Sequence, residues 1–142
     1  MQRGACVAGV ALLAVIAAGC SDGSGSAGTA TGTTLAATSG NLRVTVSVTP
    51  TSTPPGAPVR FVIHATAANA PGLLSYQVEY GDGHSDQNVV AQVCRGGANP
   101  TQRETWRLTH RYERAGTFDT IVTVNAGCTP DRTDSEVSIR VR

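Results

Sequence analysis

The feature that most constrains this chain is an alternation of apolar and polar residues that begins after Asn41. In residues 42–48 every second residue is Leu or Val, and the residues between them are Arg, Thr or Ser. The same period of two recurs in 59–66, 74–80 and 137–141. Successive side chains of a β-strand point to opposite faces, so this period predicts strands with one buried face.

Weaker strand patterns occupy residues 88–93, 106–108 and 118–124, and Gly- and Pro-rich turns such as 50–58 and 69–72 separate the strands. No segment after residue 20 shows the period of a helix. About seven short strands at this spacing predict an all-β fold in which two sheets pack as a sandwich.

The N-terminal segment has the order of a secretory signal. A short positive stretch ending at Arg3 precedes an apolar run over 5–18, which is shorter than the roughly 20 residues that span a bilayer. Small residues just before Cys20 resemble a lipobox, although Ala17 stands where Leu is more common. We expect a signal peptide over 1–19 and an exported protein, anchored to a cell membrane on its extracytoplasmic side by a lipid such as palmitate on Cys20. An ordinary signal peptide ending near a cysteine is the alternative.

Residues 21–40 are mostly Gly, Ser, Thr and Ala, with Leu35 as the one large apolar residue. This composition predicts a flexible linker over 20–40, with ends about 25 Å apart, and a folded domain over 41–142. Without Arg3, ten arginines face ten acidic residues. Because these charges are scattered along the sequence, they favour neither nucleic acid nor an anionic membrane surface as a partner.

Two cysteines, Cys94 and Cys128, remain after the signal peptide and the lipidated residue are set aside. An even pair in an oxidising compartment predicts a disulfide. Without histidines nearby in the sequence, the pair is a poor zinc site.

Three motifs follow one another in the order of a known family. They are YGDG at 80–83, THRY at 109–112 and GTF at 116–118. Together they resemble the PKD domain, over roughly 42–142. The resemblance implies an immunoglobulin-like β-sandwich.

Within this family pattern, individual residues acquire expected roles. The Asp82 carboxylate accepts hydrogen bonds from turn amides, and the Tyr112 hydroxyl satisfies loop backbone, as in a tyrosine corner. The family usually has Trp where this chain has Val78, and we expect Trp106 to fill the lost volume. Thr120 stands where a core-facing apolar residue is expected.

The chain has three histidines that could serve as ligands or bases. His64 is expected to be solvated, and His110 to pack or to donate a hydrogen bond. His84 shares a turn with Asp82 and Asp86, which makes these three weak candidates for a metal site. Calcium prefers 6–8 oxygen ligands, so we expect no metal and no cofactor.

No arrangement of nucleophile and base predicts an enzyme, because the chain lacks a strand-to-helix elbow for a serine. We expect a non-enzymatic envelope lipoprotein that mediates protein–protein interaction, with another envelope protein as partner, or acts as a surface spacer. A glycan-binding or calcium-binding module is the alternative, although few aromatic rings fall on predicted outer faces.

The immunoglobulin-like topology places both cysteines at one pole of the sandwich. The loops at that pole supply the candidate partner residues Asn69, Arg95, Asn99 and Asp131. The strand that begins at Leu42 also starts there, so we expect the tether to leave from this pole and its loops to face the membrane.

Overall fold

The computed structural model describes residues 30–94, 96 and 100–142. The predicted signal peptide and lipidation site, and the candidate partner residues Arg95 and Asn99, lie outside the described residues. None of the described residues forms a helix that could cross a membrane.

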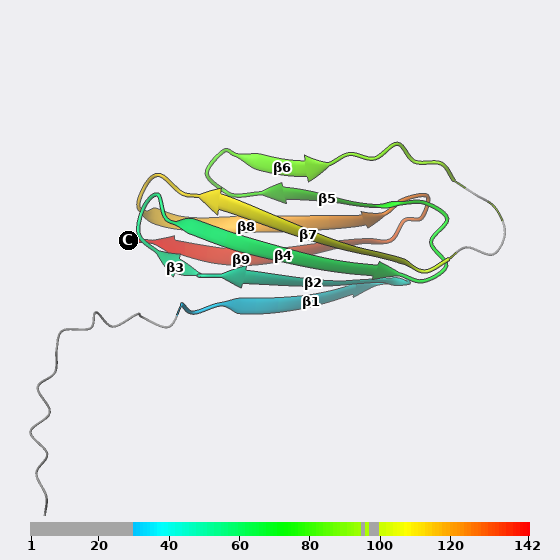
Figure 1. The fold of residues 1–142 in the computed structure, drawn as a ribbon, viewed down its shortest axis with the longest axis horizontal. Helices are drawn as coiled ribbons and strands as arrows, with labels where there is room; N and C mark the ends of the chain where they lie inside the picture. The colour runs from blue at the N-terminus through cyan, green and yellow to red at the C-terminus, as the bar shows by residue number, and fades with distance from the viewer. Residues whose placement is uncertain (1–29, 95, 97–99) are drawn as a thin grey trace, which may run out of the picture.

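Two β-sheets pack face to face (Figure 1), which confirms the predicted immunoglobulin-like sandwich. The first sheet has the order β1-β2-β4-β7, with bounds β1 Thr33–Ser39, β2 Leu42–Thr49, β4 Pro58–Ala67 and β7 Gln102–Arg111. The second sheet has the order β3-β9-β8-β5-β6, with bounds β3 Ser52–Thr53, β5 Leu74–Glu79, β6 Ser85–Asn88, β8 Gly116–Ala126 and β9 Arg132–Val141. The described residues thus form nine strands where about seven were expected.

Strand β1 shows that the prediction of a flexible linker over 20–40 is wrong for its last part. β1 pairs antiparallel with β2 from Thr33 opposite Val48 to Ser39 opposite Leu42. Leu35 is half-buried and packs against the core. These small residues can form a strand because the backbone donors and acceptors of β2 pair with their backbone. This pairing does not require apolar side chains, so the composition of the segment does not reveal it.

The core lies between the sheets and follows the predicted alternation. In β2 and β4, the apolar residues point inward and are almost fully buried. The largest buried side chains are Tyr112, Phe61, Leu42, Ile63 and Ile139. Trp106 is half-buried, and its ring centroid lies 5.0 Å from that of Tyr76, two residues before Val78.

Two strand predictions need correction. Of the strand predicted over 88–93, only Asn88 lies in a strand, as the last residue of β6, and Val89 and Val93 are exposed. The predicted turn-rich break over 50–58 contains β3, whose residues pair parallel with β9. β3 thus takes the chain briefly into the second sheet between β2 and β4, which are both strands of the first.

The two ends of the sandwich hold different features. We call the end with the 80–84 turn, the 112–115 loop and the C-terminus the Asp82 pole, and the end with the 68–73 turn, the 127–131 turn and Cys94 the disulfide pole. β1 starts at the Asp82 pole (Figure 1), where the amide of Thr51 donates to the carbonyl of Thr31. The expected exit of the tether from the disulfide pole is therefore wrong, because β1 adds one more passage along the sheet before β2.

Candidate functional site

The turn after β5 projects the Asp82 carboxylate toward β7. Gly81 and Gly83 have φ angles of 82° and 94°, which favour glycine. A Cβ atom on Gly81 would lie 2.6 Å from the carbonyl oxygen of Asp119. The Tyr80 amide donates to the His84 carbonyl oxygen at 3.0 Å and closes the turn.

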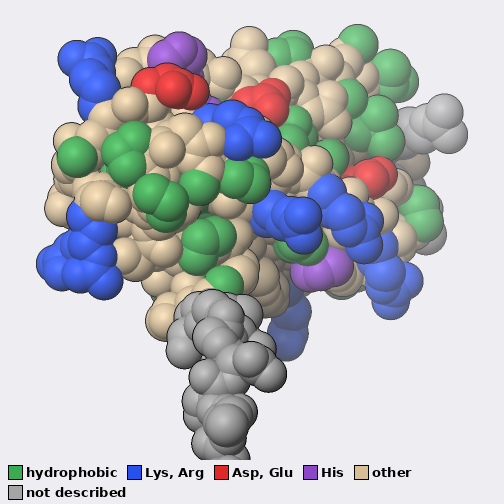
Figure 2. Space-filling view, turned by 60° about the vertical axis from the view of Figure 1, so that its left-hand side comes forward, with side chains coloured by type: hydrophobic (Ala, Val, Ile, Leu, Met, Phe, Trp, Pro, Cys, Tyr) green, Lys and Arg blue, Asp and Glu red, His purple; other side chains and the backbone are tan. Residues whose placement is uncertain are grey.

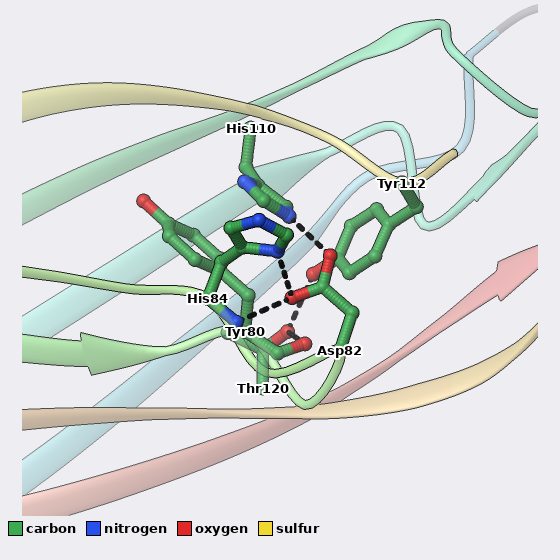
Figure 3. Close-up of polar contacts among 6 residues, drawn as sticks. All are labelled: Tyr80, Asp82, His84, His110, Tyr112 and Thr120. Atoms are coloured by element: carbon green, nitrogen blue, oxygen red, sulfur yellow. Dashed lines mark hydrogen bonds and ion pairs between the residues drawn. The ribbon is translucent and has the colours of Figure 1, made fainter. Parts of the chain in front are cut away.

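The Asp82 carboxylate uses both oxygens (Figure 3). Its Oδ1 accepts from the His84 amide at 3.0 Å, as predicted for a turn amide, and its Oδ2 lies 2.7 Å from His110 Nε2. Burial raises the pKa of Asp82, but the hydrogen bonds from His110 and from the His84 amide outweigh it and hold this pKa below its ordinary value. An ionised carboxylate only accepts, so His110 Nε2 donates.

The His110 ring is fixed by aromatic neighbours. It stacks on Tyr80, with centroids 3.9 Å apart and planes 6° apart, and meets the edge of Tyr112 at 4.6 Å. The prediction that His110 packs and makes a hydrogen bond is confirmed. His64, in contrast, is exposed on the outer face of β4 and shares a hydrogen bond of 2.9 Å with Thr105.

Below the turn, a chain of buried hydroxyl groups links Tyr112 to Tyr80. Thr120 Oγ1 donates to the Tyr80 carbonyl oxygen at 3.2 Å and lies 2.7 Å from the Tyr112 hydroxyl. Thr120 has a single hydroxyl hydrogen, so the tyrosine donates to it. Burial raises the pKa of Tyr112 to about 12. Tyr112 was expected to satisfy loop backbone directly; it does so through Thr120, which explains a polar residue at this core position.

The same turn brings together a possible metal-ligand set that differs from the predicted one. One ligand atom each of Asp82, His84 and His110 lie within 4.8 Å of one another. Asp86 does not belong to this set: its Oδ1 accepts from the Tyr76 hydroxyl at 3.4 Å. The prediction paired Asp82 and His84 with a sequence neighbour, whereas β7 supplies the third group. Two imidazoles and one carboxylate suit zinc or a related transition metal better than calcium.

The disulfide pole contains the predicted bridge. Cys94 and Cys128 are bonded, with their Cα atoms 5.6 Å apart, which confirms the pairing. Of the candidate partner residues there, Asn69 is exposed in a turn with a φ of 53°. Asp131 Oδ2 accepts from the Asn41 amide at 3.3 Å, so this carboxylate holds the β1–β2 turn.

The disulfide pole also carries an apolar surface that the sequence prediction missed. Leu73 is 46% exposed and Val93 67% exposed, and both line one hollow. The remaining lining residues are Ala70, Pro71, Gly72, Ala91, Pro100 and Gln102. Gln92 fixes one wall, because its side-chain amide accepts from the Leu73 amide at 2.9 Å and donates to the Leu73 carbonyl at 3.0 Å. The sequence pattern over 88–93 predicted a strand, so it did not indicate an exposed apolar surface here.

No family model matches the chain, and no curated protein matches it in sequence. Among solved structures, the chain is similar to the PKD domain of an M14-like peptidase from Thermoplasmatales archaeon SCGC AB-540-F20. The two share 16% identity and a TM-score of 0.52, and the match covers 75% of this chain and 98% of that chain. At this identity the likeness is one of fold. The chain therefore has the fold of a PKD domain, as its three motifs predicted.

Proposed function

We propose that this protein is a non-enzymatic module of the cell envelope, anchored by a lipid on Cys20, that binds another envelope protein through its disulfide pole. The observation that carries the proposal is the exposed apolar hollow around Leu73 and Val93. Exposed apolar surface with a polar surround is typical of protein interaction sites.

Two features support binding at this pole. The disulfide and the Gln92 hydrogen bonds hold the hollow in shape, so little conformational entropy is lost when a partner docks. β1 starts at the opposite pole, which leaves the hollow at the end of the domain remote from the anchored segment. A disulfide also accords with an exported protein.

The anchor and the binding surface are tested separately. Replacement Cys20→Ser should move the protein from the membrane fraction to the soluble fraction and abolish incorporation of labelled palmitate. For the surface, Leu73→Asp with Val93→Asp should abolish crosslinking to a discrete envelope protein in intact cells. Ile121→Asp, which changes an exposed apolar residue of β8 on another face, is the matched control and should leave the crosslink intact. Unchanged crosslinking in the double variant, or no crosslink at all, would favour the spacer role.

The cluster at the Asp82 pole supports a second candidate function, binding of a transition-metal ion. His84 is the informative residue, because its side chain is 73% exposed and its removal leaves the Asp82–His110 hydrogen bond in place. Zinc should raise the melting temperature of the wild type and not of His84→Ala, and calcium should change neither. Equal zinc responses in the two proteins would exclude the site.

A further inference from the structure

Five exposed arginines lie on the outer face of the first sheet. We call this surface the arginine face: Arg43 of β2, Arg60 of β4, and Arg103, Arg107 and Arg111 of β7. Figure 2 shows several arginine side chains gathered beside a histidine on one flank of the molecule. Arginines that are scattered along the sequence therefore share one face of the folded domain.

The register of the sheet brings these residues close together. Arg43 and Arg103 both lie opposite Thr66, so they flank β4 with Cα atoms about 10 Å apart. Arg60 lies two positions from the β4 residues opposite Arg107 and Arg111, which makes it a diagonal neighbour of both at about 7–8 Å. The five arginines therefore form two groups on one face of three strands, Arg43 with Arg103 and Arg60 with Arg107 and Arg111.

The outward positions of β1, β2, β4 and β7 hold no acidic residue; the one acidic residue of these strands, Glu104 of β7, is exposed at an inward position of that edge strand. The side chains between the arginines are Thr and Ser with Val62 and His64. None of the described ion pairs includes an arginine of the face, although Arg111 also donates to the Gly56 carbonyl at 2.6 Å.

The outer face of the second sheet has the opposite sign. It carries four carboxylates against two arginines: Glu79, Asp119, Asp134 and Glu136, with Arg132 and Arg140. A chain with balanced charge therefore folds into a domain with one basic and one acidic side.

We propose that the arginine face binds the anionic headgroups of phospholipids in the membrane that carries the anchor. One guanidinium group can donate two parallel hydrogen bonds to a phosphate, and the Thr and Ser hydroxyls between the arginines add further donors. The five best-formed cavities are lined by residues outside this face. The face itself is the outer surface of a sheet, which suits a planar array of headgroups.

The position of the anchor favours a membrane over other polyanions. This step rests on the proposed lipidation of Cys20. The first sheet includes β1, and twelve residues lie between Cys20 and Thr33, a number that as a random coil would span about 20 Å. The face can thus meet the bilayer beside its own anchor, with the acidic sheet turned away and the disulfide pole open to the side.

The test uses residues 20–142 with Cys20→Ser, because all described strands and the core lie within this range. The protein should sediment with vesicles of phosphatidylcholine mixed with phosphatidylglycerol, and not with phosphatidylcholine alone, and added salt should release it. Each arginine near an anionic surface is worth about 1 kcal/mol, or roughly fivefold in partitioning. Arg60→Gln with Arg107→Gln should therefore weaken binding about 25-fold.

The matched control is Arg132→Gln with Arg140→Gln, which removes the same charge from the opposite sheet and should change partitioning less than twofold. Equal losses in the two double variants, or no preference for phosphatidylglycerol, would overturn the proposal. Binding to heparin or DNA without binding to vesicles would also overturn it, in favour of a polyanion partner. Because Cys20 is replaced throughout, a failure of lipidation cannot produce any of these results.

Discussion

The buried hydroxyl chain under the Asp82 turn makes a sharp prediction about Thr120→Val. Valine has nearly the shape of threonine, so the change removes hydrogen bonds without opening a cavity. It leaves the Tyr112 hydroxyl and the Tyr80 carbonyl without their described partner in a fully buried site. Each buried group left unpaired costs roughly 1–3 kcal/mol, and the new methyl group recovers part of this, so we expect a loss of about 2–4 kcal/mol. At roughly 4 °C per kcal/mol for a domain of this size, the melting temperature should fall by about 8–16 °C.

Thr133 of β9 provides a matched control. It is also buried, but its Oγ1 has no partner among the described residues. Thr133→Val should therefore change stability by less than about 0.5 kcal/mol, or increase it. Thermal unfolding followed by circular dichroism measures both variants. If Thr120→Val and Thr133→Val have the same melting temperature, the hydroxyl chain does not stabilise the fold and the reasoning fails. A double-mutant cycle with Tyr112→Phe should further show that the two losses are not additive.

Three other perturbations test separate features. Reduction of the Cys94–Cys128 bond opens a loop with a sequence separation of 34. The chain-entropy model predicts that the free energy of unfolding falls by about 4 kcal/mol, which thermal unfolding with and without reductant measures. Asp82→Asn should destabilise most above about pH 5 and progressively less as pH falls through the lowered pKa of Asp82, because a carboxylate with a depressed pKa stabilises only while it is ionised; a constant difference across an acid titration would contradict this. Gly81→Ala should destabilise more than Gly83→Ala, since both have positive φ but only the first would meet backbone at 2.6 Å; equal melting temperatures would argue against a close approach there.

The sandwich and its core could be predicted from sequence because burial on one side imposes a period of two. Phe61 and Ile63 fall on the inner face by that rule alone, and both are fully buried. The disulfide was predictable for a related reason: the topology fixes which loops share a pole. Phe118, which shares the inner face of β8 with Thr120 and Val122, is only half-buried, because it lies near the start of β8 where the sheet ends.

The features that escaped prediction depend on which strands are neighbours. The metal-ligand set joins His84 to His110, and no local pattern links residues so far apart in the chain, although the His-x-Tyr motif marked the second of them. The arginine face escaped for the same reason. Arg43, Arg60 and Arg107 look isolated in sequence and become adjacent only through the β2–β4–β7 register.

Strand β1 also determines whether the domain aggregates at high protein concentration. Without it, β2 would be an edge strand whose eight residues alternate Leu or Val with Arg43, Thr and Ser and offer unpaired backbone groups. The remaining edges are already poor templates for another chain, since β3 has two residues, β6 has four and β7 carries arginines. A domain cut at residue 41, where the alternation begins, would expose this eight-residue edge. Such a fragment should aggregate or exchange strands between molecules, whereas a domain that retains Thr33–Ser39 should stay monodisperse at the same concentration.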